Sequence, residues 1–288
     1  MKTFVVIIAI FFTFCLSSIA QVSLPRESQK QSILQNVGDT TISIVYHRPN
    51  VKGRKVWGEL VPYGEVWRSG ANEATVFEVS KDVTINGKPL PAGKYSLHTI
   101  PSQKDWTIIF NKKWDQWGSF DYDEKLDALR VTATPAASDF RESLGYGVGD
   151  VGPTSAKIAL RWERLSVPFT VDIGDIHGRI YPQLVKAIAD RKTDDVRPLH
   201  QAANYVVQFK LKDHYTDALK WVETSIAARE TFSNLGLKAR LFNEQGKTKE
   251  AIVLAERAIG VGKSSQPPTN ANALNALQEV VDGWKAQK

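Results

Sequence analysis

The chain has 288 residues, and its apolar and aromatic content, including eight tryptophans, is high enough to exclude wholesale disorder. This length suits about two domains. The formal net charge is +6, but the basic residues are scattered along the chain, so we expect no nucleic-acid partner.

The first twenty residues have the features of a cleaved signal peptide. Lys2 supplies a positive start, Phe4 to Leu16 is a short apolar run, and Ser18-Ile19-Ala20 is a small-x-small cleavage site. The apolar run is shorter than the ~20 residues that a spanning helix needs, so we expect no membrane span after cleavage. The sequence therefore predicts an exported protein, periplasmic or extracellular, whose mature chain begins at Gln21.

The single cysteine, Cys15, lies inside this signal. The mature chain would therefore have no thiol, which excludes disulfides and thiolate metal ligands. Its stability must come from packing.

Residues 21–173 carry the signals of short strands separated by Gly and Pro. The Asn86-Gly87 pair is a strong turn signal between two of them. Alternating β-branched and aromatic residues favour an antiparallel β-sandwich, jelly-roll-like, with one face of each strand buried. The runs are 41–46, 74–80, 83–85, 94–100, 106–111, 129–134, 140–146, 156–162 and 167–173.

The composition changes to Ala, Leu, Lys and Glu at helical spacing after Asp175. Residues 174–194 form a connecting segment, with a helix expected near 180–188. Residues 195–288 then form a helical domain. We expect helices at 195–210, 214–229, 232–245, 248–261 and 269–286, which makes the whole chain a multidomain α+β protein.

An internal repeat lies within the helical domain. Asp217-Ala218-Leu219 aligns with Glu250-Ala251-Ile252 at an offset of 33 residues, and Phe209 aligns with Phe242. This pattern resembles tetratricopeptide repeats, whose period is about 34 residues. We expect such a helical part to pack on the β domain or to present a groove to a protein partner, and the alternative is a plain helical bundle.

The stretch from Val66 to Phe77 holds the most varied polar chemistry of the chain. Arg68, Asn72 and Glu73 could line a pocket in which a guanidinium fork binds a carboxylate or sugar hydroxyls. The alternative is a structural network, with Arg68 paired to Glu73 and Asn72 bonded to its own turn.

Trp67 and Trp117 are candidate stacking platforms for a sugar, and the alternative is that such rings close one end of the sandwich. His98 is a further candidate for the polar site, and a structural histidine is the alternative. His47 and His98 are the only histidines in the β domain, and their spacing matches no metal motif. The sequence therefore predicts neither a metal nor a cofactor.

Long motifs of the β domain resemble the bacterial secreted family catalogued as domain of unknown function 2911. The resemblance implies an exported β domain typical of Bacteroidetes-like bacteria, sometimes followed by helical repeats, and it carries over no activity. The motifs that carry it are Tyr46-His47-Arg48-Pro49-Asn50-Val51-Lys52-Gly53-Arg54, Leu60-Val61-Pro62-Tyr63-Gly64, Val66 to Thr75, Leu90 to Leu97, Thr99-Ile100-Pro101, Trp106 to Lys112 and Gln116-Trp117-Gly118.

These observations favour a non-catalytic binding or scaffold protein with a polar pocket around Arg68 to Glu73. Its ligand would be a carbohydrate or a small polar molecule. One alternative is a hydrolase that acts on a glycan or peptide through Glu73 or His98, and glycoside cleavage would need two carboxyl groups ~5–10 Å apart. The other alternative is a purely structural protein-interaction module.

Overall fold

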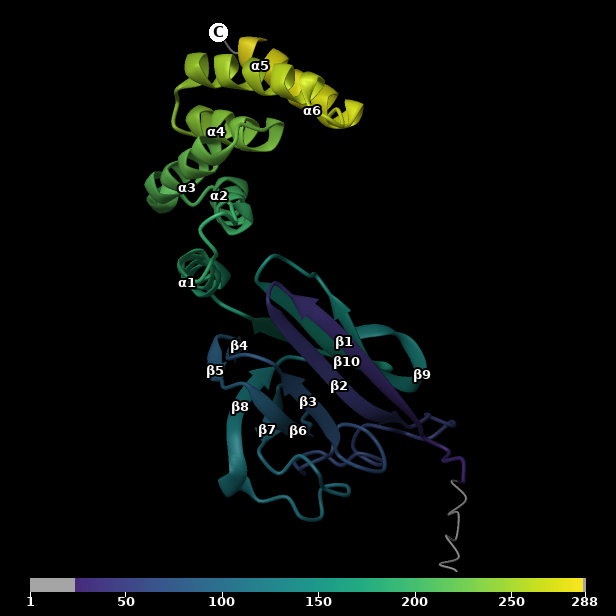
Figure 1. The fold of residues 1–288 in the computed structure, drawn as a ribbon. Coiled ribbons are helices and arrows are strands. Elements are labelled where there is room, and N and C mark those ends of the chain that lie inside the picture. Colours follow the sequence, from purple (N-terminus) through teal and green to yellow (C-terminus); the bar gives the residue numbers. More distant parts are fainter. Residues whose placement is uncertain (1–23, 287–288) are drawn as a thin grey trace, which may run out of the picture. The chain divides into compact units, whose positions relative to one another are not determined.

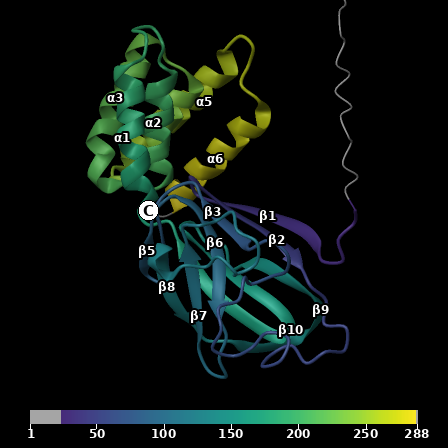
Figure 2. The same cartoon turned by 90° about the horizontal axis from the view of Figure 1, so that it is seen from below.

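A computed structural model describes residues 24–286 of the protein. The chain forms two compact units, divided between Gly174 and Asp175 (Figures 1 and 2). Within the described range the first unit holds ten strands and the second holds six α-helices, which confirms the predicted antiparallel sheets followed by helices. The predicted signal peptide, residues 1–20, lies outside the described residues.

The strands of the first unit form two antiparallel sheets. The six-stranded sheet has the order β1-β2-β3-β6-β7-β8, and the four-stranded sheet has the order β5-β4-β10-β9 (Figure 1). Strands that follow one another are neighbours in the larger sheet, except that the β4–β5 hairpin joins the smaller one. The bounds are β1 Gln29–Val37, β2 Thr40–Arg48, β3 Thr75–Val79, β4 Val83–Ile85, β5 Lys88–Leu90, β6 Gly93–Ile100, β7 Trp106–Asn111, β8 Asp127–Ala133, β9 Ala136–Gly149 and β10 Ser155–Asp172.

The period-two alternation of the strands places one of their faces in the core. On β2, Ile42 and Ile44 are buried, whereas the residues between and beside them are partly exposed. Phe77 of β3 and Phe110 of β7 both contact Phe169 of β10, with ring centroids 6.1 and 6.0 Å away. The two sheets therefore share one aromatic core. The finer expectation of a jelly-roll-like sandwich stays a prediction.

Two strands carry little apolar signal. The edge strand β1 is exposed or half-exposed along most of its length, and β5 holds only three residues. Periodicity misses such strands because an edge strand need not bury a full face.

The strand β10 also differs from the sequence prediction, because it joins the predicted strands 156–162 and 167–173. Glu163 between them has φ +55° and the pairing with β9 shifts on each side of it, so a β-bulge bends the strand without ending it.

The β7–β8 loop, residues 112–126, is bonded to the larger sheet. Gln116 donates to Ser96 of β6 at 3.1 Å, and Asn111 at the end of β7 donates to the carbonyl of Asp123 at 2.8 Å. These bonds fix the loop against β6 and β7. The loop contributes several of the residues described below.

The second unit is entirely helical in its regular structure. Each helix packs against the next, and α2 also contacts α4. Two apolar clusters fill it, and they bury Trp221 and Trp284 among helical neighbours. The bounds are α1 Ile176–Ala189, α2 Arg197–Gln208, α3 Tyr215–Ala228, α4 Phe232–Glu244, α5 Thr248–Ser264 and α6 Ala271–Ala286.

The repeated small residues of the helices lie at closely packed positions. Ala218, Ala251 and Ala258 are all fully buried, so a larger side chain at any of them would push neighbouring helices apart. Gly246 ends α4 with φ +79°, a conformation that glycine adopts without a steric penalty. The five predicted helices are present, while their tetratricopeptide-like character stays a prediction. Among the described residues, no helix is long and apolar enough to cross a membrane.

Candidate functional site

The segment from Trp67 to Glu73 connects the larger sheet to the β7–β8 loop. Trp67 forms an isolated antiparallel bridge with Thr99 of β6, and Glu73 forms one with Trp117. Between these bridges the backbone turns tightly, with φ +55° at Ser69 and +57° at Asn72. Non-glycine residues rarely adopt such angles, and they persist only where the surroundings hold them. The segment is therefore fixed at both ends.

Asn72 joins three parts of the chain. Its side-chain amide donates to the carbonyl of Ser28 at 3.2 Å, and its own carbonyl accepts the N–H of Gly118 at 3.1 Å. The residue thus ties the start of β1 to the turn and to the β7–β8 loop. The alternative drawn from the sequence, a bond from the Asn72 side chain to its own turn, does not occur among the described contacts.

Glu73 pairs with a residue that precedes β1. Nη1 of Arg26 lies 2.7 Å from both carboxylate oxygens of Glu73, and Nδ1 of His47 lies 3.5 Å from one of them. Burial by itself would raise the pKa of Glu73, but the hydrogen bond from Arg26 and the nearby charges lower it below the ordinary value. Glu73 is therefore held ionised, and its partner is Arg26 instead of the predicted Arg68.

A cavity of about 430 Å³ lies beside Glu73, and we call it the Glu73 pocket. Two indoles of the β7–β8 loop line it, with Trp114 42% and Trp117 52% exposed. The Arg26 guanidinium lies 5.4 Å from the Trp117 ring centroid, and the Lys94 ammonium lies 5.2 Å from that of Trp114. The complete lining is Lys30, Val45, His47, Glu73, Ala74, Val76, Trp114, Asp115, Gln116 and Trp117.

Trp67 and Arg68 line a different cavity, of about 280 Å³, which we call the Arg68 cavity. The Trp67 ring stacks on Trp162 at 6.0 Å and 21°, and its Nε1 donates to the carbonyl of Gly70 at 3.2 Å. Trp67 is thus part of the packing between the sheets as well as part of this wall. The two cavities share no lining residue.

His98 is fully buried on β6. Its Nδ1 lies 3.1 Å from the hydroxyl of Ser119, and its Nε2 lies 3.1 Å from the hydroxyl of Ser96. Burial lowers the pKa of His98 from 6.5 to about 4; Asp127 opposes this shift and Arg68 adds to it. The imidazole is therefore neutral at pH 7, and it lines neither of the two cavities.

The six predicted site residues consequently divide into four groups. Glu73 and Trp117 line one cavity, Trp67 and Arg68 line the other, and Asn72 bonds to Ser28 between them, whereas His98 is enclosed. The sequence motif did not indicate Arg26 and Lys30, because they belong to a polar edge segment without a pattern. Spacing alone did not indicate that His47, on β2, would reach Glu73.

The described residues hold no group of three or more His, Cys, Asp or Glu side chains placed to bind a metal ion. The linings of both cavities contain charged, amide and aromatic side chains. Such groups bind ligands through hydrogen bonds and stacking.

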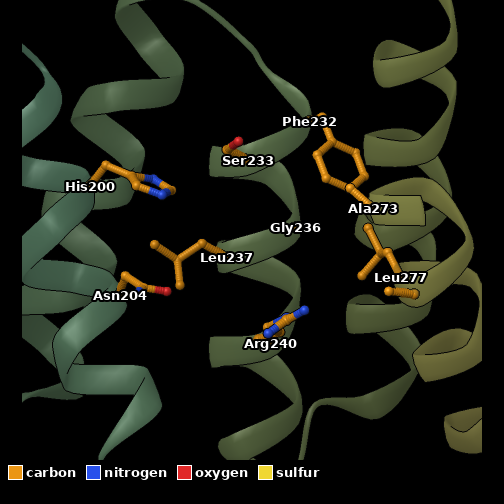
Figure 3. A pocket seen from close by; sticks show the side chains of 10 residues that line it. His200, Asn204, Phe232, Ser233, Gly236, Leu237, Arg240, Ala273 and Leu277 are labelled. Carbon is orange, nitrogen blue, oxygen red and sulfur yellow. The ribbon is translucent and has the colours of Figure 1, made fainter. Parts of the chain in front are cut away.

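The helical unit has a cavity of its own, of about 350 Å³ (Figure 3). Its floor is apolar, and polar side chains from α2 and α4 lie at its rim. A neighbouring cavity of about 730 Å³ shares His200, Asn204 and Ser233 with it. The lining residues of the first are His200 and Asn204 of α2, Phe232, Ser233, Gly236, Leu237 and Arg240 of α4, and Ala273, Ala276 and Leu277 of α6.

Comparison with known protein families matches residues 28–171, half of the chain, to the family described as "Protein of unknown function (DUF2911)". No curated protein and no solved structure matches the chain.

Proposed function

We propose that this chain, which belongs to the DUF2911 family of proteins of unknown function, is an exported, non-catalytic binding protein. Its β unit binds a carbohydrate or a similar small polar ligand in the Glu73 pocket. The observation that carries the proposal is the pair of exposed indoles, Trp114 and Trp117, beside a carboxylate in one cavity.

The lining of the Glu73 pocket offers the groups that a sugar needs. An indole presents a flat apolar face, which packs against the C–H face of a sugar ring. Glu73 and Asp115 offer acceptors for hydroxyl groups, and Lys30 offers donors. Cavities of ~300–1,000 Å³ with a few convergent polar groups are the usual sites for small molecules, and this one has about 430 Å³.

The same geometry favours binding over hydrolysis. A glycosidase needs one carboxylic acid with a raised pKa to protonate the leaving group. The pKa of Glu73 is instead lowered, because the hydrogen bond from Arg26 and the nearby charges outweigh the raising effect of burial. His98, the other residue considered for catalysis, is fully buried. The hydrolase interpretation therefore gains no support from these two residues.

Calorimetric titration with a panel of mono- and oligosaccharides tests this proposal. We expect Trp117→Ala to weaken binding of a sugar that the wild-type chain binds by about tenfold, since one stacked ring contributes ~1–1.5 kcal/mol. Phe140→Ala is the matched control, because Phe140 is 48% exposed and also lies under an arginine, Arg164 at 5.7 Å. Absence of binding across the panel, or equal affinity of the Trp117 and Phe140 variants, would refute the assignment.

Export is a separate part of the proposal and has its own test. Mass spectrometry of the protein isolated from its native cells should give a chain that begins at Gln21 and lacks the first twenty residues. Recovery of the intact chain from the cytoplasm would contradict it.

The helical unit supports a second candidate function, the binding of a protein partner. The supporting observation is the apolar-floored cavity across α2, α4 and α6, with exposed Asn204 and Arg240 at its rim (Figure 3). A double variant, Asn204→Arg with Ser233→Arg, would block the opening of this cavity. Both positions are exposed, so the core would stay intact. Binding to a peptide array should then disappear while the helical circular dichroism stays unchanged. If the array binds both chains equally, this cavity is not the site.

A further inference from the structure

The Arg68 cavity is lined by other residues than the Glu73 pocket, and Ser28, the partner of Asn72, is one of them. Its most distinctive member is Arg68. The Nε atom of this arginine is buried and has no hydrogen-bond partner. Within residues 24–286, the Arg68 side chain forms no ion pair with a carboxylate.

An arginine in this position keeps its charge. The guanidinium does not lose its proton in proteins, so burial cannot be relieved by neutralisation. Burial lowers the pKa of Arg68, and no neighbouring carboxylate offsets that effect. Arg26 and Arg130 differ in this respect, because they pair with Glu73 and Asp127 at 2.7 and 2.6 Å. The positive charge of Arg68 is thus left without a counter-charge inside the fold.

The other walls of the cavity add positive charge. Lys52 and Arg54 also line it, and the one carboxylate in the lining, Glu27, is paired with Lys52. Among the residues that the structure describes, Arg54 donates to the backbone carbonyls of Val51 and Asn50 and pairs with no carboxylate. An anion in the cavity would therefore meet an excess of cations.

The cavity also has an apolar part. Leu60, Val61, Trp67 and Trp162 contribute to the lining, together with the ring of Pro49, and the polar side chains of Ser28 and Asn50 lie among them. Inorganic phosphate has no apolar surface to place against such walls. An organic acid has both parts, a carboxylate that a guanidinium binds in a fork and a body that packs against rings.

We propose that the Arg68 cavity binds the carboxylate group of a small organic anion whose apolar body packs against Trp67. This site is independent of the carbohydrate site proposed above. Without such a ligand, Arg68 lowers the stability of the fold, because an unpaired, partly buried charge is unfavourable.

Calorimetry and thermal unfolding of the full chain test this, with benzoate as the probe and with chloride and inorganic phosphate as comparisons at constant ionic strength. We expect benzoate to bind and to raise the unfolding temperature of the β unit. Arg68→Met should weaken benzoate binding at least tenfold. Without ligand, the same variant should unfold at a temperature equal to or above that of the wild-type chain.

Arg48→Met is the matched control. Arg48 does not line the cavity, and its Nε donates to the carbonyl of Leu144 at 2.8 Å. We expect this variant to unfold at a lower temperature and to bind benzoate within twofold of the wild-type chain.

Four outcomes would overturn the assignment: no benzoate binding by the wild-type chain, stronger binding of phosphate than of benzoate, unchanged binding by the Arg68 variant, or a loss of folding when Arg68 is replaced. The last would show that the guanidinium supports the fold instead of a ligand. Trp117→Ala should leave benzoate binding unchanged, which separates this result from that of the carbohydrate proposal.

Discussion

Acidification should weaken the β unit through His98. In the folded chain the pKa of His98 is about 4, whereas an unburied histidine has a value of 6.5. Between these two pH values the unfolded chain takes up a proton that the folded chain excludes. The neutral imidazole therefore makes its full contribution to the stability of the fold above pH 6.5. This contribution is lost as the pH falls from 6.5 to about 4.

The magnitude follows from the two pKa values. One pKa unit corresponds to ~1.4 kcal/mol, so a fall from 6.5 to about 4 amounts to about 3 kcal/mol. Most small domains are stable by only ~5–15 kcal/mol, so a loss of this size would be readily measured. The physical cause is that a protonated ring would lie buried between the hydroxyls of Ser96 and Ser119.

Urea unfolding at a series of pH values from 7.5 to 4.5 provides the assay. Tryptophan fluorescence reports mainly on the β unit, because six of the eight tryptophans lie in it. The control is His98→Gln, which cannot titrate and keeps polar atoms near both hydroxyls. We expect the free energy of unfolding to fall by about 2–3 kcal/mol more in the wild-type chain than in the variant.

The comparison between the two chains removes the contribution of every other titrating group. If both chains lose the same free energy of unfolding across this range, His98 titrates with an ordinary pKa. In that case the β7–β8 loop does not seal it from water, and the enclosed site described above is wrong.

Four further substitutions test the packing and one helix cap, each by urea unfolding. Gly70→Ala should lower the free energy of unfolding by about 1–3 kcal/mol, because the added Cβ would lie 2.9 Å from Oγ1 of Thr75. Gly147→Ala is the control and should change stability little, because no atom lies within 4 Å of its added Cβ. Phe77→Ala should cost about 3–5 kcal/mol through the cavity left at the aromatic core, and a loss below 1 kcal/mol would show that the sheets do not share it. Thr231→Ala removes the side-chain cap of α4 and should lower the free energy of unfolding of the helical unit by about 1 kcal/mol. The unfolding of the β unit should not change, and an equal loss there would contradict the division into two units.

The strands with full alternation could be predicted from the sequence. Residues 41–46 lie within β2, and residues 106–111 are β7, because each buries a β-branched or aromatic face. Residues 29–37 could not be predicted in this way, since β1 is an edge strand. The helices α2 to α6 followed from their composition, and Gly246 marked the end of α4.

The candidate site could be predicted only as a segment. The mixture of Arg68, Asn72 and Glu73 in a tight turn indicated polar contacts, but not which group meets which. The partner of Glu73 is Arg26, 47 residues earlier, and the partner of Asn72 is Ser28. No spacing rule connects positions so far apart in the chain, because their proximity depends on how β1 pairs with β2.

Local sequence thus determined the class of the elements that bury a full periodic face, since propensity and periodicity act within a few neighbouring residues. Tertiary structure decided the chemistry of the polar turn. Strand pairing brought Arg26 to Glu73 and left Arg68 without a carboxylate, and the β7–β8 loop enclosed His98 while it left Trp117 exposed. These outcomes depend on contacts between distant segments, and the residue types alone do not specify them.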